Sequence, residues 1–117
     1  MNSILTTTKK MIGLTEEYEI FDVDIITYIN STFAVLRELG VGPNEGFSID
    51  GPEAVWDDFV APGPLQSLVR AYMPLKVRLL FDTTMTSGVN EAIKGQISDL
   101  EWRINTEVDP EDTYVDL

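Results

Sequence analysis

The sequence predicts an all-α protein: a small antiparallel bundle of about four helices, with an aromatic-rich loop and an acidic C-terminal tail. Apolar residues recur at intervals of three and four in separate segments, which is the spacing of a helix face packed on a core. Glycine and proline punctuate the chain between these segments. Of the 117 residues, 44% are hydrophobic and 24% are charged, so the chain can form one compact core.

The first expected helix spans residues 3–13. Ser3 is placed to cap its N-terminus, because a serine hydroxyl accepts a hydrogen bond from a free backbone amide of the first turn. Gly13 is placed to end it. The expected apolar face is thin and consists of Ile4, Met11 and Ile12.

The second expected helix follows an acidic linker. Asp22 is expected to be its N-cap, and Gly40 is expected to end it. Six apolar residues at helical spacing form the face that should pack on the core. They are Ile25, Ile26, Ile29, Phe33, Leu36 and Leu39.

Residues 42–64 contain too many glycines and prolines for a long element. Phe47, Trp56 and Phe59 lie in this segment, and aromatic side chains are costly to leave in water. We therefore expect a loop that folds onto the bundle and seals one end of it. Trp56 and Phe59 also suit a binding platform, but such a pair belongs more often to a core.

The third long helix is expected over residues 65–82, with Pro74 inside it. Proline removes a backbone hydrogen bond, so we expect a kink or a break near residues 70–73. The expected apolar face of this helix is broad. It consists of Leu65, Leu68, Val69, Tyr72, Leu75, Leu79 and Leu80.

The last helix is expected to begin after the N-cap Ser87 and to continue to about residue 105. Its apolar stripe has the most regular spacing in the chain and consists of Val89, Ile93, Ile97, Leu100 and Ile104. Taken together, the stripes predict a set of buried residues. This set is Ile29, Phe33, Leu68, Leu79, Ile93, Ile97 and Leu100.

The net charge is −12, from 20 acidic and 8 basic residues. Tight binding to nucleic acid is disfavoured, because affinity for phosphates comes mainly from lysine and arginine. Anionic membranes also repel a negatively charged protein. An acidic passage would still let DNA pass without holding it. The chain has no cysteine and no segment that resembles a signal peptide or a membrane span, which suits synthesis in a reducing cytoplasm.

We expect no catalytic residues, no metal site and no cofactor. Without histidine and cysteine, the usual triads, thiol nucleophiles and zinc sites are excluded, and no phosphate-binding glycine loop occurs. Acidic residues are crowded in residues 16–24 and at Asp57 and Asp58, so a glycosidase pair or a magnesium site is conceivable. Solvated surface is the more common role of such acids, and the prediction is a protein that is not an enzyme.

Two features of the sequence indicate contacts with another subunit. Arg70, Lys76 and Arg78 form the densest basic cluster in an acidic chain, which would suit the acidic face of an adjacent copy. The alternative is that they only balance charge along their helix. Trp102 lies off the stripe of the last helix, so it either covers the core from the side or faces a neighbouring subunit, where tryptophan is enriched.

Residues 1–105 are expected to form the helical domain, and residues 106–117 an acidic C-terminal arm. The arm holds five of the 20 acidic residues and no basic one, so we expect it to stay outside the bundle. Tyr114, Val115 and Leu117 give the arm an apolar tip that suits docking on a partner. A solvated tail without a role is the equally weighted alternative.

Several strings of the sequence resemble the small head–tail connector, or adaptor, proteins of long-tailed phages of Gram-positive bacteria. The resemblance covers residues 3–105, and Pro74 departs from it, because a better helix former is expected there. The matching strings are SIL at 3–5, KKMIGL at 9–14, FDVDII at 21–26, INS at 29–31, LGVGP at 39–43, WDDF at 56–59, YMPLKVRLLFD at 72–82 and LEWR at 100–103.

The resemblance implies a structural virion protein of the neck, made in the cytoplasm of the bacterial host, that docks under the portal vertex after DNA packaging. It further implies a homo-oligomeric ring of about twelve copies, with neighbouring neck or tail-completion proteins as further partners. DNA would pass through this ring without specific binding. Head-to-tail packing in a ring needs two different side patches on each subunit, which acidic and basic helix faces can supply.

A second class of protein would use the same charge differently. An acidic inhibitor that mimics DNA would occupy the basic groove of a nuclease or a repressor. Such a mimic spreads carboxylates densely over one face, whereas the acids here are scattered among helix starts, loops and the tail. An enzyme with a carboxylate site is the third alternative.

Overall fold

The computed structural model describes residues 2–82 and 84–109, which form five helices and no strand. The expectation of an all-α bundle is therefore confirmed. The helices are α1 (Ile4–Met11), α2 (Asp22–Glu38), α3 (Trp56–Phe59), α4 (Pro64–Phe81) and α5 (Ser87–Val108).

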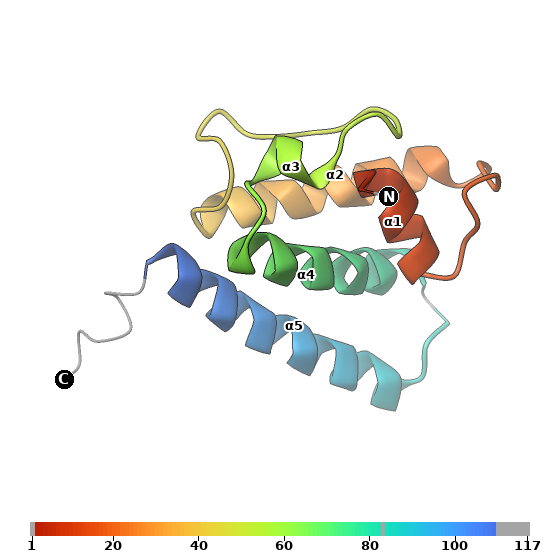
Figure 1. Ribbon diagram of the computed structural model, residues 1–117. Helices are drawn as coiled ribbons and strands as arrows, with labels where there is room; N and C mark the ends of the chain where they lie inside the picture. Colours follow the sequence, from red (N-terminus) through yellow and green to blue (C-terminus); the bar gives the residue numbers. More distant parts are fainter. Residues whose placement is uncertain (1, 83, 110–117) are drawn as a thin grey trace.

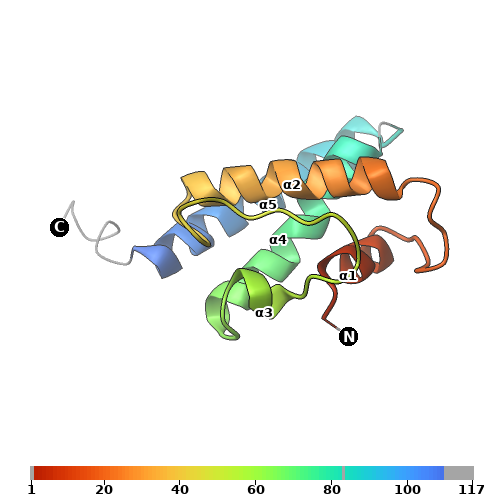
Figure 2. The same cartoon turned by 90° about the horizontal axis from the view of Figure 1, so that it is seen from above.

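Helix α4 is the centre of the molecule, because each of the other four helices packs against it. In Figure 1, α2 lies above α4 and α5 lies below it, and consecutive long helices run in opposite directions. Figure 2, which views the molecule from above, shows α1 and α3 on the same side of α2, below it in the picture. The three long helices therefore form three layers, with α4 in the middle.

The core contains most of the residues that the stripes predict. Ile29, Phe33, Ile93 and Ile97 are buried, whereas Leu68, Leu79 and Leu100 are only partly buried and pack at the edge of the core. The buried apolar residues are Ile4, Leu5, Ile25, Ile29, Phe33, Leu36, Val41, Ile49, Trp56, Phe59, Val69, Tyr72, Met73, Val77, Ile93, Ile97 and Ile104.

The apolar face expected for α4 was partly wrong. Met73 and Val77 are fully buried, whereas Leu80 is exposed. Because α2 and α5 cover α4 from two sides, the helix is apolar around most of its circumference, and no single stripe marks the side that faces the core. The helix also runs without a break through Pro74, which is itself buried, so the break expected there is not found.

The capping residues agree with the sequence at one helix and differ at two. Ser3 caps α1 as expected, since its hydroxyl accepts a hydrogen bond from Thr6 N at 3.2 Å. Helix α2 already includes Asp22, and Phe21 occupies the cap position. Helix α5 includes Ser87, and the preceding Thr86 is the cap, with its hydroxyl accepting from the backbone of the next turn.

Helix α5 continues to Val108, three residues beyond its expected end. Val108 packs against the hydrophobic core, close to the turn that follows α2. A Cβ added at Gly40 would lie only 3.0 Å from Val108 Cγ1, and Gly40 has a φ of +88°, a conformation that favours glycine. The first residues of the expected acidic arm therefore belong to the bundle.

The loop between α2 and α4 folds onto the bundle through its aromatic residues. The ring of Phe33 on α2 lies 4.5 Å from that of Phe59 and 5.0 Å from that of Phe47, measured between centroids. The ring of Trp56 is 6.5 Å away and is fully buried. The expectation that these aromatic residues belong to the core is confirmed.

Candidate interaction surfaces

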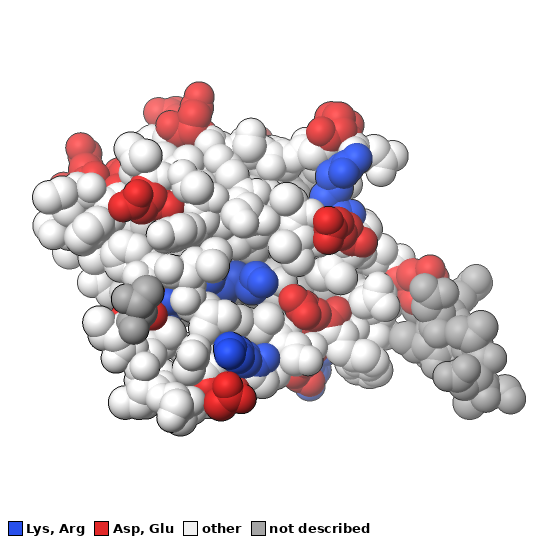
Figure 3. All heavy atoms as spheres, turned by 180° about the vertical axis from the view of Figure 1, so that it is seen from behind, with Lys and Arg blue, Asp and Glu red and all other residues white. Residues whose placement is uncertain are grey.

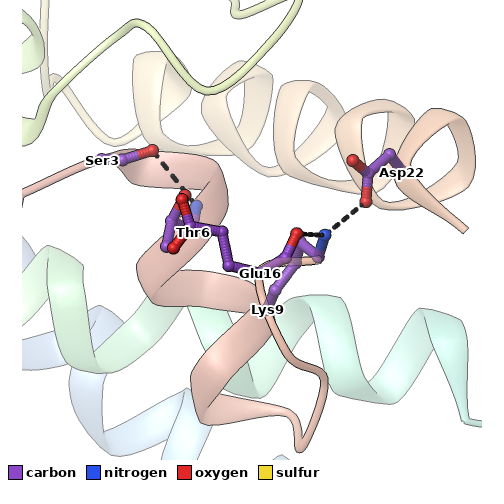
Figure 4. A network of polar contacts seen from close by, with 5 residues as sticks. All are labelled: Ser3, Thr6, Lys9, Glu16 and Asp22. Atoms are coloured by element: carbon purple, nitrogen blue, oxygen red, sulfur yellow. Dashed lines mark hydrogen bonds and ion pairs between the residues drawn. The ribbon is translucent and has the colours of Figure 1, made fainter. Parts of the chain in front are cut away.

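A buried ion pair holds the N-terminal part of the chain together. Lys9 on α1 has a side chain that is only 2% exposed, and its Nζ lies 2.8 Å from Asp22 Oδ1 at the first turn of α2. The same ammonium donates a hydrogen bond to the backbone carbonyl of Glu16 at 3.1 Å (Figure 4). Lys9 therefore joins α1, the acidic linker and α2.

The role of Lys9 was missed in the sequence. Ile4, Leu5 and Lys9 share the buried side of α1. A lysine on the apolar face of a helix, followed along the chain by several acidic residues, is the pattern that would have predicted this role. The same pairing explains why Asp22 begins α2 without capping it, because its carboxylate is engaged by the lysine.

An open groove of about 570 Å³ lies on the outer side of α1 and along the linker. Its lining includes Thr6, Thr7, Lys10, Leu14, Thr15 and Glu17. Met11, Ile20 and Val23 are exposed apolar side chains on the same part of the chain, and Val23 is 77% exposed. None of these three side chains lines the groove, but exposed apolar residues that gather in one region are typical of a surface that contacts another protein.

The acidic residues that suggested a catalytic or metal site have structural roles or lie apart. Asp57 accepts a hydrogen bond from the Gln66 side chain at 2.8 Å, and Asp58 accepts one from the Val55 backbone at 2.9 Å. Within residues 2–82 and 84–109, no three acidic side chains come together in a way that would hold a metal ion. In the same part of the chain, no helix has the length and hydropathy that crossing a membrane requires.

The basic cluster of the sequence is divided in space. Arg70 is partly buried, and its guanidinium lies 5.9 Å from the centroid of the Trp56 ring and donates to Asn2 Oδ1 at 3.2 Å. Lys76 and Arg78 are two residues apart, which turns them about 200° around the helix axis. Arg78 is exposed and Lys76 is partly buried. The three bases therefore do not form one patch.

Arg78 lies at the C-terminal end of α4, close to Asp82. Hydrogen bonds from the side chain and backbone of Thr84 lower the pKa of Asp82, and the charge of Arg78 adds a smaller effect in the same direction. Arg78 is itself exposed, so this local pairing leaves it accessible to a partner.

Helix α5 is joined to α4 by a buried polar contact as well as by apolar packing. The Tyr72 hydroxyl donates to Glu101 Oε2 at 2.6 Å. Burial, together with this bond and the negative charge of Glu101, raises the pKa of Tyr72 far above its usual range, so the tyrosine stays protonated as the donor. Glu101 therefore points toward α4 and does not contribute to an outer acidic face.

Trp102 lies about 100° around the α5 axis from Glu101 and is 63% exposed. Of the two positions expected for it, over the core or facing outward, the structure places it outward. Tyr114, Val115 and Leu117, the expected tip of the C-terminal arm, lie outside the described residues.

The charges on the rear face of the molecule are mixed. Figure 3 shows basic and acidic atoms interspersed among uncharged ones, without a dense array of either sign. Several bases are also engaged inside the chain. Those with a hydrogen bond, ion pair or ring contact among the described residues are Lys9, Arg37, Arg70, Lys94 and Arg103.

Comparison with known proteins gives one match. No curated protein and no solved structure is significantly similar to the chain. A family model described as "Phage connector protein" matches residues 4–111, which include every helix of the structure. Because this match covers nearly the whole sequence, the chain belongs to the phage connector protein family, a family of structural proteins.

Proposed function

We propose that the protein is a head–tail connector of a long-tailed phage of Gram-positive bacteria, located in the virion neck, that docks on the portal after DNA packaging. It closes into a ring of about twelve copies, and neck or tail-completion proteins bind its other side. The family match over residues 4–111 is the observation that carries the proposal.

The charge of the chain supports the passage of DNA through such a ring. A surface that grips DNA needs free lysine and arginine side chains, because these displace the counterions of the phosphates. Only 8 of the 117 residues are basic, against 20 acidic ones. Several of these bases are engaged within the chain, so DNA would slide past without specific binding.

The DNA-mimic alternative has no comparable support. A mimic requires carboxylates spread densely over one face, whereas the face in Figure 3 mixes acids, bases and uncharged atoms. Glu101 also turns toward the core, where it accepts the Tyr72 hydroxyl.

Mixing the purified protein with the portal of the same phage tests the proposal. We expect a stable complex in native mass spectrometry and a ring on the portal in electron micrographs. Phages that lack the gene should accumulate filled heads without tails. A chain that binds no portal, in a phage that assembles normally without it, would contradict the connector function.

Removing residues 110–117 tests the C-terminal arm within the same assay. This cut leaves α5 whole, because the helix ends at Val108. We expect thermal unfolding to change little and portal binding to fall, since the proposed apolar tip is lost. Replacing Tyr114, Val115 and Leu117 by serine is the matched control that keeps every acid. If the truncated protein binds the portal as well as the full chain does, the arm is dispensable.

Reversing the charges of Lys76 and Arg78 on α4 tests their place in the ring. We expect Lys76→Glu and Arg78→Glu, made separately, each to weaken the ring while helical content stays the same. Because the two bases point in different directions, they should act on different contacts. The glutamine variants should have intermediate effects that diminish at high salt. Rings that form equally well in all four variants would remove both bases from the interface.

A further inference from the structure

One end of the bundle carries most of the exposed apolar surface. At this end α1 and α4 finish and α2 and α5 begin, toward the right in Figure 1 and Figure 2. Of the seven large apolar side chains exposed among the described residues, six belong to this end, and the seventh is Trp102. The six residues, which we call the apolar end, are Met11, Tyr18, Ile20, Val23, Leu80 and Val89.

Contacts between aromatic rings make the apolar end continuous. The ring of Tyr18 in the linker lies 5.8 Å from that of Phe21, measured between centroids. The ring of Phe21 in turn lies 5.2 Å from that of Phe81, the last residue of α4. Both phenylalanines are partly exposed, so the apolar surface of the linker continues to α4. Single exposed apolar residues are ordinary, whereas a continuous patch of them is typical of a protein contact.

A buried polar atom at the same end of the bundle lacks a partner. Asn90 lies in the first turn of α5, and its Oδ1 is buried and accepts no hydrogen bond from the described residues. Asn90 lines an open pocket of about 270 Å³ together with Leu79, Asp82, Met85 and Lys94. Buried acceptors in proteins are nearly always bonded, so a donor from outside the chain is expected here. Water can supply it in the free protein, and a side chain of a partner can supply it in a complex.

We propose that the apolar end docks on a different protein of the virion, whose contact surface is apolar and carries lysine or arginine, one of which enters the Asn90 pocket. The inference rests on the proposed function in one respect, namely that the chain joins other proteins in the neck. It adds which surface makes such a contact and what chemistry the partner has.

The charge around the apolar end indicates a basic partner. Residues 9–24 and 78–94, which surround it, hold seven acidic and four basic residues. One of the four bases, Lys9, is buried in its pair with Asp22. Opposite charges at the rim favour association, so the partner should carry bases there. The exposed acids are Glu16, Glu17, Glu19, Asp24 and Glu91.

The Asn90 pocket suits a basic side chain. Guanidinium and ammonium groups only donate hydrogen bonds, so either can bond to Asn90 Oδ1, and the carboxylate of Asp82 in the same lining supplies the opposite charge. Lys94 also lines the pocket, but its ammonium lies 3.7 Å from Glu91 Oε2, which offsets its charge. The apolar residues of the lining can cover the aliphatic part of the incoming side chain.

The same charges disfavour a second copy of the chain as the occupant. Each copy has a net charge of −12, and five of its eight bases already have a partner within the chain. Two apolar ends that face each other would bring their exposed acids together, which lowers affinity. The C-terminal arm, with five acids and no base, would be repelled in the same way.

Photo-cross-linking in phage particles identifies the protein that covers the apolar end. The photoreactive residue p-benzoyl-phenylalanine takes the place of Ile20, in a chain supplied from a plasmid to a phage that lacks the gene. After irradiation, we expect the chain joined to a different virion protein, through a segment that contains lysine or arginine. The same photoreactive residue in place of Ser31, which is exposed in the middle of α2, is the matched control and should not give this product.

Two substitutions separate docking from folding. Val23→Asp adds an acid in the first turn of α2, where the helix dipole favours it, so thermal unfolding should not fall. Asn90→Leu removes the oxygen that has no partner, so it should not destabilise the chain either. Each should lower the yield of the cross-linked product at least about tenfold. Ser31→Asp adds the same charge elsewhere on α2 and should leave the yield unchanged.

The possible results separate the docking from the connector function. Cross-links from Ile20 to another copy, or none in particles that contain the chain, would overturn the docking and leave the connector function standing. A partner segment without lysine or arginine, or an unchanged yield in both variants, would overturn it too. A chain that is absent from particles, in a phage that assembles normally without it, would overturn both.

Discussion

Replacing Phe33 by alanine is expected to lower the free energy of unfolding by about 3–5 kcal/mol, as truncation of a buried aromatic residue usually does. The Phe33 side chain is fully buried, and its ring touches three other aromatic rings that come from the loop between α2 and α4. A cavity here would loosen the loop as well as the core. Urea unfolding followed by circular dichroism measures the change.

Val23→Ala is the matched control for this prediction. Val23 lies on the same helix and is 77% exposed, so its truncation should change the free energy of unfolding by less than about 0.5 kcal/mol. A loss of less than about 1 kcal/mol for Phe33→Ala would mean that the aromatic residues of the loop do not pack on α2 as the structure shows.

The two long outer helices, α2 and α5, could largely be predicted from the sequence because each of them has one covered side, although Val89 of the expected α5 stripe is 42% exposed. The face expected for α1 was wrong at Met11, which is 69% exposed. The stripe of α5 gave Ile93, Ile97 and Ile104 correctly, and that of α2 gave Ile25, Ile29 and Phe33. Helix α4 differs because α2 and α5 cover it from two sides, so its leucines are distributed around the axis. Periodicity identifies a helix with one covered side far better than one with two.

Proximity in sequence was a poor guide to the candidate interface. Arg70, Lys76 and Arg78 were grouped because they are close along the chain, but helical rotation turns them in different directions, and Arg70 is held by Trp56 and Asn2. The outward position of Trp102 could be predicted as one of two alternatives, because it lies off the stripe of α5. The α1 groove could not, since it depends on how the linker folds back on α1.

The largest polar effect is expected at the buried ion pair, where Asp22→Ala should lower the free energy of unfolding by about 3–5 kcal/mol. The variant leaves the ammonium of Lys9, with a side chain only 2% exposed, held by a single backbone carbonyl. Lys9→Met should cost clearly less. The Asp22 side chain is 24% exposed, so part of the carboxylate reaches water although its Oδ1 is buried, and the positive end of the α2 dipole favours a negative charge at that position.

This asymmetry is expected of a buried lysine whose partner keeps part of its carboxylate in water. Asp24→Ala, in the same helical turn but exposed, is the matched control and should cost only about 0.3–1 kcal/mol. Because Lys9 also holds Glu16, loss of its partner should loosen the linker that borders the α1 groove. Chemical unfolding of the three variants measures the order of their stabilities. Equal losses for Asp22→Ala and Lys9→Met would show that the lysine is hydrated and that the ion pair does not hold α1, the linker and α2 together.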